Sequence, residues 1–360
     1  MNKELIIFNP SIEDGGVEKN LFLINNFLAT KGIKTSVISA EKHKKKEFNK
    51  KVNFFFPQYI NFDQSKRYKK YFFCLMLLVK RILFNKTKYI FSFQANIYCI
   101  IVSKLLGAKV IVRMNTAPQK WDRSLFKNKI YSYFIKKADI VIVNSSFFQK
   151  EVNKRYGIRS FLIHNPFDFK KIKTLSKKKI KYKFDQKKLN LINIGRLTDQ
   201  KDQITLLKSL TKIKDKNKIL LTIIGKGEKR KDLIEFVKNN DLNKYVKFLD
   251  YQKNPFPYMN LADVFILSSK FEGSPNVLIE AQILNKHIFS TDCPTGPKEI
   301  LKNYKKGDLF KVKNYNELAK LIINFKKKSI NEKSFFFKEL KKYESKNSCK
   351  KYLFLVKNIA

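Results

Sequence analysis

Residues 5–38 read LIIFNPSIEDGGVEKNLFLINNFLATKGIKTSVI, and this stretch sets the architecture of the first half of the chain. The apolar run at 5–8 ends in a Pro- and Gly-containing loop, which predicts a strand and a turn. Apolar residues then recur every three or four positions, as on one face of a helix. Gly32 ends that helix, and residues 35–38 supply the next strand. The stretch therefore predicts a strand–helix–strand unit.

The same alternation continues to the C-terminal region of the chain. In the first half, further strands are expected at residues 89–93, 109–113, 140–143 and 161–163. A second series is expected at residues 189–194, 219–224, 246–249, 264–267 and 287–290. Helical stretches fill the gaps, so the sequence predicts an α/β protein with parallel sheets covered by helices on both faces.

The chain length and one Lys-rich stretch indicate two domains. At roughly 150 residues per domain, 360 residues correspond to two. We expect an N-terminal domain at 1–168, a Lys-rich linker at 169–188, a C-terminal domain at 189–345, and a final helix at 346–360 that packs back on the first domain. An Ala-Asp pair precedes a strand in both halves, at 138–139 and at 262–263, so the two domains are expected to be alike.

Composition excludes several classes of protein. With 44% hydrophobic and 29% charged residues, the chain is neither collagen-like nor disordered. Its four cysteines form no C-x-x-C pair, so neither a disulfide framework nor a cysteine zinc site is expected, and a reducing compartment fits best. The first apolar run is far shorter than that of a signal peptide, so we expect a cytoplasmic protein.

The formal net charge of +46, from 76 Lys and Arg against 30 Asp and Glu, leaves three interpretations open. A polyanion such as nucleic acid or an anionic membrane surface would bind such a chain. The lysines are spread over the whole sequence, however, so compositional drift is the favoured interpretation. Net charge bears on nonspecific association and does not decide fold or chemistry.

Residues 71–79 form an uninterrupted apolar run of nine residues between Lys-rich flanks. As a helix the run spans about 13 Å, which is too short to cross a bilayer of about 30 Å. Two alternatives remain: an interfacial helix that lies among lipid headgroups, or a buried crossover helix of the first domain. The buried helix is favoured.

Ligands of open α/β sheets bind beyond the carboxyl ends of the strands, so the residues that follow each strand are the candidates. Gly195 and Arg196 follow one strand directly, and Lys201 comes five residues later, just before a helix. A guanidinium fork, a mobile ammonium and a helix start together suit a diphosphate. A solvated basic loop is the alternative.

The segment FEGSPNVLIEA at residues 271–281 carries two carboxylates, Glu272 and Glu280. Ser274 is expected to cap a helix that begins at Pro275, and the start of that helix offers amide donors to an anion. Carboxylates eight residues apart can accept hydrogen bonds from sugar or ribose hydroxyls. A surface acid and a helical salt bridge are the alternative.

Other loops after strands add weaker signals. Gly225 and Gly227 form a turn that allows close approach of the backbone to a nucleotide, and Gly15 and Gly16 do so at the first helix start. The loop at 291–300 precedes a helix opened by Pro297. Ordinary turns are the alternative for these glycines.

Several well-known motifs are absent from the sequence. It has no G-x-G-x-x-G opening the first helix, no P-loop, no H-E-x-x-H and no G-x-S-x-G. Dehydrogenase, P-loop and hydrolase functions therefore lose their usual support. There is also no Asp-x-Asp pair, so a metal-bridged diphosphate is not indicated, and none of the three histidines is given a catalytic role.

Together these segments resemble glycosyltransferase family four, the retaining nucleotide-sugar transferases of the GT-B fold. The resemblance covers nearly the whole chain and rests on Gly15-Gly16-Val17-Glu18, on Gly195-Arg196-Leu197 with Lys201-Asp202, and on the pair Glu272 and Glu280. It implies two Rossmann-like, doubly wound domains that face a central cleft.

The resemblance also implies roles for particular residues. Arg196 and Lys201 would bind the donor diphosphate, Glu272 the transferred sugar, and Glu280 the ribose. Gly15 and Gly16 would lie against the diphosphate. The remaining donor-binding positions would be Gly195, Gly225, Gly227, Ser274, Pro275, Asn276 and Val277. Catalysis would need no metal, no cofactor and no enzyme nucleophile.

One departure concerns the acceptor. Many members of the family carry a histidine in a loop of the first domain where this chain reads Arg113-Met114-Asn115. We place Arg113 and Asn115 near the acceptor instead.

The expected activity is transfer of a hexose or N-acetylhexosamine from a nucleotide diphosphate sugar, with UDP as the expected nucleotide. The acceptor would be a glycan or polyprenyl-linked glycan at the inner face of an anionic membrane, in the synthesis of surface polysaccharide. Two alternatives stay open: a GT-B sugar-nucleotide epimerase, and a basic nucleic-acid-binding protein. The latter leaves Glu272 and Glu280 unexplained, so no specific nucleic acid is expected as a partner.

Overall fold

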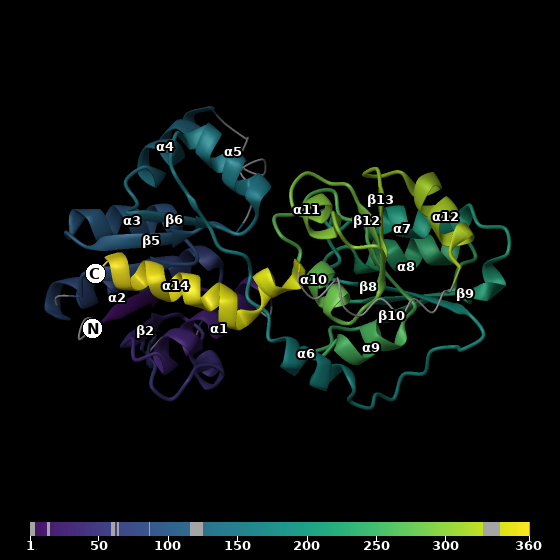
Figure 1. The fold of residues 1–360 in the computed structure, drawn as a ribbon, viewed down its shortest axis with the longest axis horizontal. Helices are drawn as coiled ribbons and strands as arrows, with labels where there is room; N and C mark the ends of the chain where they lie inside the picture. The colour runs from purple at the N-terminus through teal and green to yellow at the C-terminus, as the bar shows by residue number, and fades with distance from the viewer. Residues whose placement is uncertain are drawn as a thin grey trace. The chain divides into compact units, whose positions relative to one another are not determined.

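The computed structural model describes residues 4–12, 15–58, 62, 65–85, 87–115, 125–326 and 339–359. The chain forms two compact units (Figure 1). Unit 1 comprises Met1–Phe167 and Lys342–Ala360, and unit 2 comprises Asp168–Lys341.

The strands described in unit 1 form a seven-stranded parallel sheet in the order β3-β2-β1-β4-β5-β6-β7. They are β1 Leu5–Phe8, β2 Thr35–Ile38, β3 Asn53–Phe55, β4 Tyr89–Ser92, β5 Lys109–Arg113, β6 Ile140–Val143 and β7 Phe161–Leu162. Because β1 pairs with β2 on one side and β4 on the other, the strand order reverses there.

Helices cover both faces of this sheet. They are α1 Gly16–Thr30, α2 Arg67–Asn85, α3 Asn96–Leu105, α4 Leu125–Ile135, α5 Ser146–Tyr156 and α14 Ser345–Ile359, with 3₁₀ turns at Lys42–Glu47 and Lys341–Tyr343. Side chains alternate along β1, so Leu5 and Ile7 pack with α1 and α14 on one face. Ile6 and Phe8 pack with α2, α3 and α5 on the other.

The C-terminal helix α14 returns to unit 1 and packs against α1 (Figure 1). Tyr352 of α14 is fully buried, and its hydroxyl oxygen accepts a hydrogen bond of 2.9 Å from Nε of Arg113. Burial raises the pKa of the Tyr352 phenol, although the neighbouring Arg113 lowers it. A buried hydrogen bond thus joins the last helix to β5.

The strands of unit 2 form a six-stranded sheet in the order β10-β9-β8-β11-β12-β13, and all pairs are parallel. They are β8 Leu189–Ile194, β9 Ile219–Ile224, β10 Val246–Leu249, β11 Val264–Leu267, β12 His287–Thr291 and β13 Gly307–Phe310. The strand order reverses between β8 and β11.

Helices again lie on both faces of this second sheet. They are α6 Phe169–Ser176, α7 Gln203–Thr211, α8 Arg230–Asn239, α9 Phe256–Leu261, α10 Asn276–Ile283, α11 Pro297–Leu301 and α12 Tyr315–Asn324, with a 3₁₀ turn at Lys216–Lys218. Leu206, Leu233 and Leu318 bring α7, α8 and α12 into one core with alternate strand residues. On the other side, α6 contacts α9 and α10. The predicted α/β class and both parallel sheets are therefore confirmed.

The Ala-Asp pair that recurs in the sequence has the same role in both units. The carboxylate of Asp139, before β6, accepts a hydrogen bond of 2.6 Å from the amide of Val110 in β5. The carboxylate of Asp263, before β11, accepts one of 2.9 Å from the amide of Asn190 in β8. Each aspartate therefore holds the beginning of a neighbouring strand.

Part of the predicted linker is folded, so that prediction is wrong for residues 169–176. These residues form α6, whose Ile172 is buried, and the carbonyl of Leu175 accepts a hydrogen bond of 3.0 Å from Asn254 Nδ2. The short helix packs on α9, a contact that its Lys-rich sequence does not reveal. The strands β3 and β13 were not expected either.

Within the described residues, no helix is long and apolar enough to cross a bilayer.

Tyr352→Phe tests the contact between α14 and β5. Removing the hydroxyl leaves Nε of the buried Arg113 without its acceptor, which costs about 1–3 kcal/mol. We expect a lower denaturant midpoint for unfolding of unit 1, measured by circular dichroism. The control is Tyr68→Phe, because Tyr68 is well exposed and should leave the midpoint unchanged. Equal midpoints for the two variants would contradict a stabilising role of the contact.

Candidate functional site

The candidate residues of unit 2 gather where the strand order of its sheet reverses. Strands β8 and β11 are neighbours in the sheet. The chain continues from β8 into α7 and from β11 into α10. The loop 195–202 follows β8 and the loop 268–275 follows β11. Such a reversal opens a crevice beyond the carboxyl ends of the strands, which is where open α/β sheets bind ligands.

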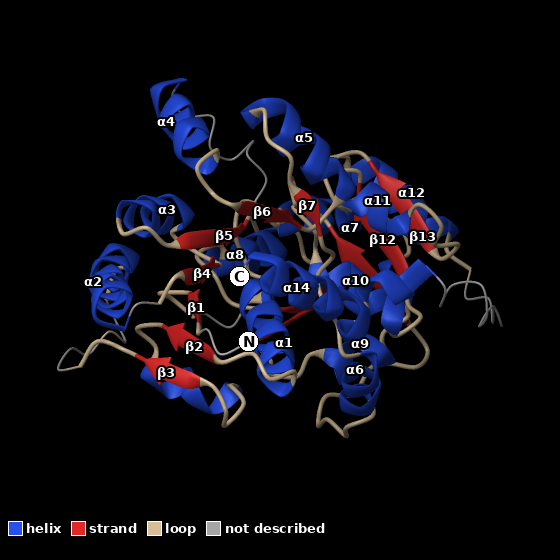
Figure 2. Ribbon diagram, turned by 60° about the vertical axis from the view of Figure 1, so that its left-hand side comes forward, coloured by secondary structure: helices blue, strands red, loops and turns tan. Residues whose placement is uncertain are grey.

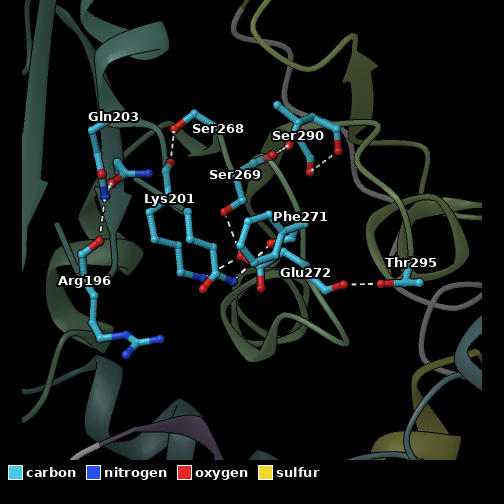
Figure 3. Close-up of polar contacts among 12 residues, drawn as sticks. Arg196, Lys201, Gln203, Ser268, Ser269, Phe271, Glu272, Ser290 and Thr295 are labelled. Atoms are coloured by element: carbon cyan, nitrogen blue, oxygen red, sulfur yellow. Dashed lines mark hydrogen bonds and ion pairs between the residues drawn. The ribbon is translucent and has the colours of Figure 1, made fainter. Parts of the chain in front are cut away.

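An ion pair joins these two loops. Nζ of Lys201 lies 2.5 Å from Oε1 of Glu272, and the hydroxyl of Ser269 donates to the same oxygen at 2.6 Å (Figure 3). Both charged side chains are largely buried. Two residues that the sequence assigned separately to diphosphate and sugar are therefore in direct contact.

Further hydrogen bonds hold the two loops together. The hydroxyl of Ser268 donates to the carbonyl of Lys201 at 2.9 Å, and the side-chain amide of Gln200 donates to the carbonyl of Phe271 at 3.0 Å. The amide of Lys270 donates to the carbonyl of Gln200 at 2.9 Å. The position of Lys201 is thus fixed by its backbone as well as by its charge.

Arg196 lies in the same loop but differs in its surroundings. Its side chain is exposed, and in Figure 3 the guanidinium lies apart from the Lys201–Glu272 pair. Its carbonyl accepts a hydrogen bond of 3.0 Å from Gln203, which holds the backbone. Among the residues that the structure describes, no hydrogen bond or ion pair of the guanidinium is found. The five donors of this fork are therefore available to a ligand.

Glycines 225 and 227 allow the loop after β9 to pack on the loop after β8. A Cβ at Gly225 would lie 1.9 Å from the carbonyl oxygen of Gly195, and one at Gly227 would lie 2.2 Å from that of Leu197. The amide of Leu197 donates to the carbonyl of Lys226 at 2.9 Å. Packing between the two loops thus requires both glycines, and their contact with a nucleotide stays a prediction.

The end of β12 and the loop between β12 and α11 also bond to the loop 268–275. The hydroxyl of Thr295 donates to the Glu272 carbonyl (Figure 3). The hydroxyl of Thr291, the last residue of β12, donates to the Ser269 carbonyl at 2.7 Å. Gly296 has φ +88°, and a Cβ there would lie 2.7 Å from the Gly273 carbonyl oxygen. The predicted start of α11 at Pro297 is confirmed.

Five polar residues of this site were not predicted from the sequence. Their side chains hydrogen-bond to backbone or side-chain atoms of the loops, which no motif signals: Gln203, Ser268, Ser269, Thr291 and Thr295. Thr291 and Thr295 lie in the loop that the sequence had singled out, but without a role for either. Only the fold shows that all five bond to the two loops that the ion pair joins.

The start of α10 differs from the prediction. The helix begins at Asn276, and Pro275 occupies the cap position with extended backbone angles. The predicted helix start, with Ser274 as the cap and Pro275 as the first helical residue, is therefore off by one residue. Pro275 has a helical φ of −68° but an extended ψ of 107°, so it precedes the first helical residue and Ser274 lies one position further out.

Two further side chains of unit 2 are buried. Glu280 is buried on α10, about one turn after the helix start. The thiol of Cys293 follows β12, and burial, together with the negative charge of Glu272, raises its pKa to about 12. Cys293 is therefore a protonated thiol at neutral pH and no nucleophile.

The candidate residues of unit 1 lie at the carboxyl edge of its own sheet. Gly15 precedes α1 as its cap residue and Gly16 is its first residue. Asn115 follows β5, and its amide donates to the carbonyl of Phe93 at 2.9 Å.

The prediction that Arg113 contacts the acceptor is wrong. Its side chain is fully buried, with 0% exposure. The guanidinium donates to Tyr352, to Asn165 at 2.5 Å and to Asn115. A charge in the protein interior needs such partners, and here all of them come from unit 1 itself. Arg113 holds the edge of the sheet together and has no surface left for a substrate.

Within the described part of the chain, no group of three or more His, Cys, Asp or Glu side chains is placed to hold a metal ion.

Comparison with known proteins identifies the family. Residues 14–171 match Glycosyltransferase Family 4, and residues 176–344 match Glycosyl transferases group 1. The chain is 36% identical over 178 residues to an uncharacterized glycosyltransferase of Methanocaldococcus jannaschii, covering 48% of this chain and 44% of that protein. It is 26% identical over 244 residues to a Campylobacter jejuni N-acetylgalactosamine-N,N'-diacetylbacillosaminyl-diphospho-undecaprenol 4-alpha-N-acetylgalactosaminyltransferase, covering 64% of each.

In both cases the match spans less than two thirds of the relative's own length. Among solved structures, Anabaena Alr3699/HepE in complex with UDP and glucose superposes with a TM-score of 0.79 at 16% identity, covering 99% of this chain and 100% of that one. This likeness establishes the fold.

The chain therefore belongs to glycosyltransferase family four and has the GT-B fold.

A double-mutant cycle tests whether the Lys201–Glu272 contact stabilises unit 2. Lys201→Met and Glu272→Gln should each lower the free energy of unfolding by about 3 kcal/mol, because each leaves a largely buried charge unpaired. The double variant should lose less than the sum, with a coupling of about 0.5–3 kcal/mol in denaturant unfolding. Strictly additive losses would contradict a direct interaction.

Proposed function

We propose that this glycosyltransferase moves a hexose or N-acetylhexosamine from a UDP-sugar to a glycan or polyprenyl-linked glycan. Its product would enter the synthesis of cell-surface polysaccharide, and the anomeric configuration of the sugar would be retained. The observation that carries the proposal is the arrangement of Arg196, Lys201 and Glu272 at the strand reversal of unit 2.

The two cations suit the diphosphate of the donor in different ways. Arg196 offers an exposed planar fork, which binds phosphate oxygens in a bidentate manner. Lys201 is held by Glu272 through one contact, and an ammonium has three donors, so others remain for a phosphate oxygen. Both charges would stabilise the nucleotide diphosphate as it leaves, and such preorganised donors supply much of the catalysis in enzymes.

The other residues would bind the rest of the donor. Glu272, held by Lys201 and Ser269, would accept hydrogen bonds from hydroxyls of the transferred sugar. Glu280 would bind the ribose. Backbone and side chains at the start of α10, at positions 274–277, would lie along the phosphates. Because protein cations carry the leaving-group charge, we expect transfer without a metal and without an enzyme nucleophile.

Two findings on similar proteins support the choice of substrates. The structurally similar Alr3699/HepE was solved with UDP and glucose. The Campylobacter jejuni relative is named for an acceptor on diphospho-undecaprenol. A lipid-linked acceptor of this kind would place the enzyme at the inner face of an anionic membrane.

A thermal-shift panel with UDP, GDP and their common sugars, each with and without EDTA, tests the donor. We expect UDP compounds to raise the melting temperature, because a ligand at about 100 times its dissociation constant adds about 2.7 kcal/mol. EDTA should leave the shift unchanged. Stabilisation by RNA or DNA and by no nucleotide would overturn the proposal.

Arg196→Ala and Lys201→Ala test the roles of the two cations. Each loses a donor to the leaving diphosphate, so we expect turnover to fall by about 10²–10³-fold. The measurement is transfer of radiolabelled sugar from the donor identified by thermal shift to a polyprenyl-diphosphate glycan.

The matched control is Lys214→Ala. Lys214 is exposed and precedes β9, so it lies at the opposite edge of the sheet and should leave turnover unchanged. Near-normal turnover in both Arg196→Ala and Lys201→Ala would refute the assignment.

A further inference from the structure

Helix α2 is apolar on two opposite faces. Its inward face packs Cys74, Leu78 and Ile82 into the core of unit 1. The outward face exposes large apolar side chains by more than half, at helical spacing: Tyr68, Phe72, Met76, Leu83 and Phe84. A helix that is apolar all round is normally buried or in contact with lipid. The inward contacts do not account for the outward face.

Helices α3 and α4 extend the same surface. α2 packs against α3, and α3 packs against α4, so the three helices lie side by side on unit 1 (Figure 2). Each contributes further exposed apolar side chains: Tyr98 and Leu105 on α3, and Ile130 and Tyr133 on α4. Phe84 and Leu105 are 78% and 79% exposed. We call these nine side chains the α2–α4 surface. Contiguous exposed apolar patches mark sites of interaction.

The three helices of the α2–α4 surface carry charges of one sign only. A carboxylate from outside them, that of Asp139, pairs with Lys104 of α3. Residues 67–85, 96–105 and 125–135 contain no Asp or Glu. Lys69 and Lys80 are exposed on the outward face of α2, at helical spacing from Met76, and Lys129 is exposed on α4. Two other cations of α2 differ, because Lys70 and Arg81 form ion pairs with Glu41 and Glu4. The outward lysines are thus the ones that a partner meets.

This combination selects one kind of partner. A second copy of the same surface would bring lysines against lysines with no carboxylate on these helices to pair them. Nucleic acid would meet the lysines but would leave the apolar stripe without a role. An anionic bilayer satisfies both: apolar side chains enter the boundary between headgroups and acyl chains, and lysine stems extend to lipid phosphates.

We propose that the α2–α4 surface docks unit 1 on an anionic lipid bilayer. The lysines contribute electrostatic attraction to the anionic headgroups, and the apolar side chains add the hydrophobic part. Docking would bring the enzyme to a lipid-linked acceptor, and this part of the inference rests on the proposed function. Binding to lipid is measured without catalysis.

The test is flotation of the full chain with vesicles of equal parts phosphatidylglycerol and phosphatidylcholine. We expect the variant Phe72→Ser/Met76→Ser/Phe84→Ser to bind these vesicles at least about tenfold more weakly than the unaltered chain. Vesicles of phosphatidylcholine alone should bind the unaltered chain weakly, and high salt should weaken binding to the anionic vesicles.

The matched control removes three exposed apolar side chains from elsewhere: Ile234→Ser/Ile323→Ser/Phe354→Ser. It should bind vesicles as the unaltered chain does. All six side chains are exposed, so both variants should keep the melting temperature and the UDP shift, which shows that they are folded.

Unchanged vesicle binding by the α2–α4 variant would overturn the inference, as would equal binding to neutral vesicles. Self-association that this variant abolishes, without any vesicle binding, would assign the surface to a second copy and overturn it too. If vesicles bind but no nucleotide does, the proposed function fails while docking stands. If transfer to a lipid-linked acceptor proceeds without vesicle binding, docking fails alone.

Discussion

The ion pair between Lys201 and Glu272 joins the two loops that leave the sheet of unit 2 at its strand reversal. Either charge alone would be costly there, because both side chains are largely buried. Pairing removes most of that cost and fixes the loops, with Ser269 and Thr295 completing the bonds of Glu272. The fold thus brings an ammonium and a carboxylate to the place where parallel sheets bind ligands.

The same loop treats its two cations differently. Lys201 is held inside by a carboxylate, whereas Arg196 extends outward as a fork with a full set of donors. A site built this way has one charge that is positioned in advance and one that adapts to the ligand. In unit 1 the guanidinium of Arg113 differs from that of Arg196. It donates hydrogen bonds to three acceptors inside the unit, so it stabilises the edge of the sheet and the packing of α14.

Helix α2 has features of both alternatives that the sequence left open, a buried crossover helix and an interfacial helix. Its inward face is a buried crossover helix of unit 1, as Cys74 and Leu78 show. Its outward face exposes Phe72 and Met76 among lysines, as an interfacial helix would. The nine-residue apolar run holds both faces at once, because a helix divides a continuous run between opposite sides. An apolar run alone does not reveal which of its sides is covered.

The sequence by itself determined the order of most elements, because apolar periodicity and the Gly and Pro positions depend only on local geometry; α6, β3 and β13 are the exceptions. The strands before Asn9 and Gly195, for example, follow from short apolar runs that end at turn residues. It also placed Arg196, Lys201 and Glu272 after strands, through a motif whose spacing is set by the chain. Tertiary structure alone decided burial and partners. Arg113 and Arg196 are the same residue type at the same kind of position, and only packing made one internal and the other exposed. Partners 71 residues apart, such as Lys201 and Glu272, meet only when β8 and β11 pair.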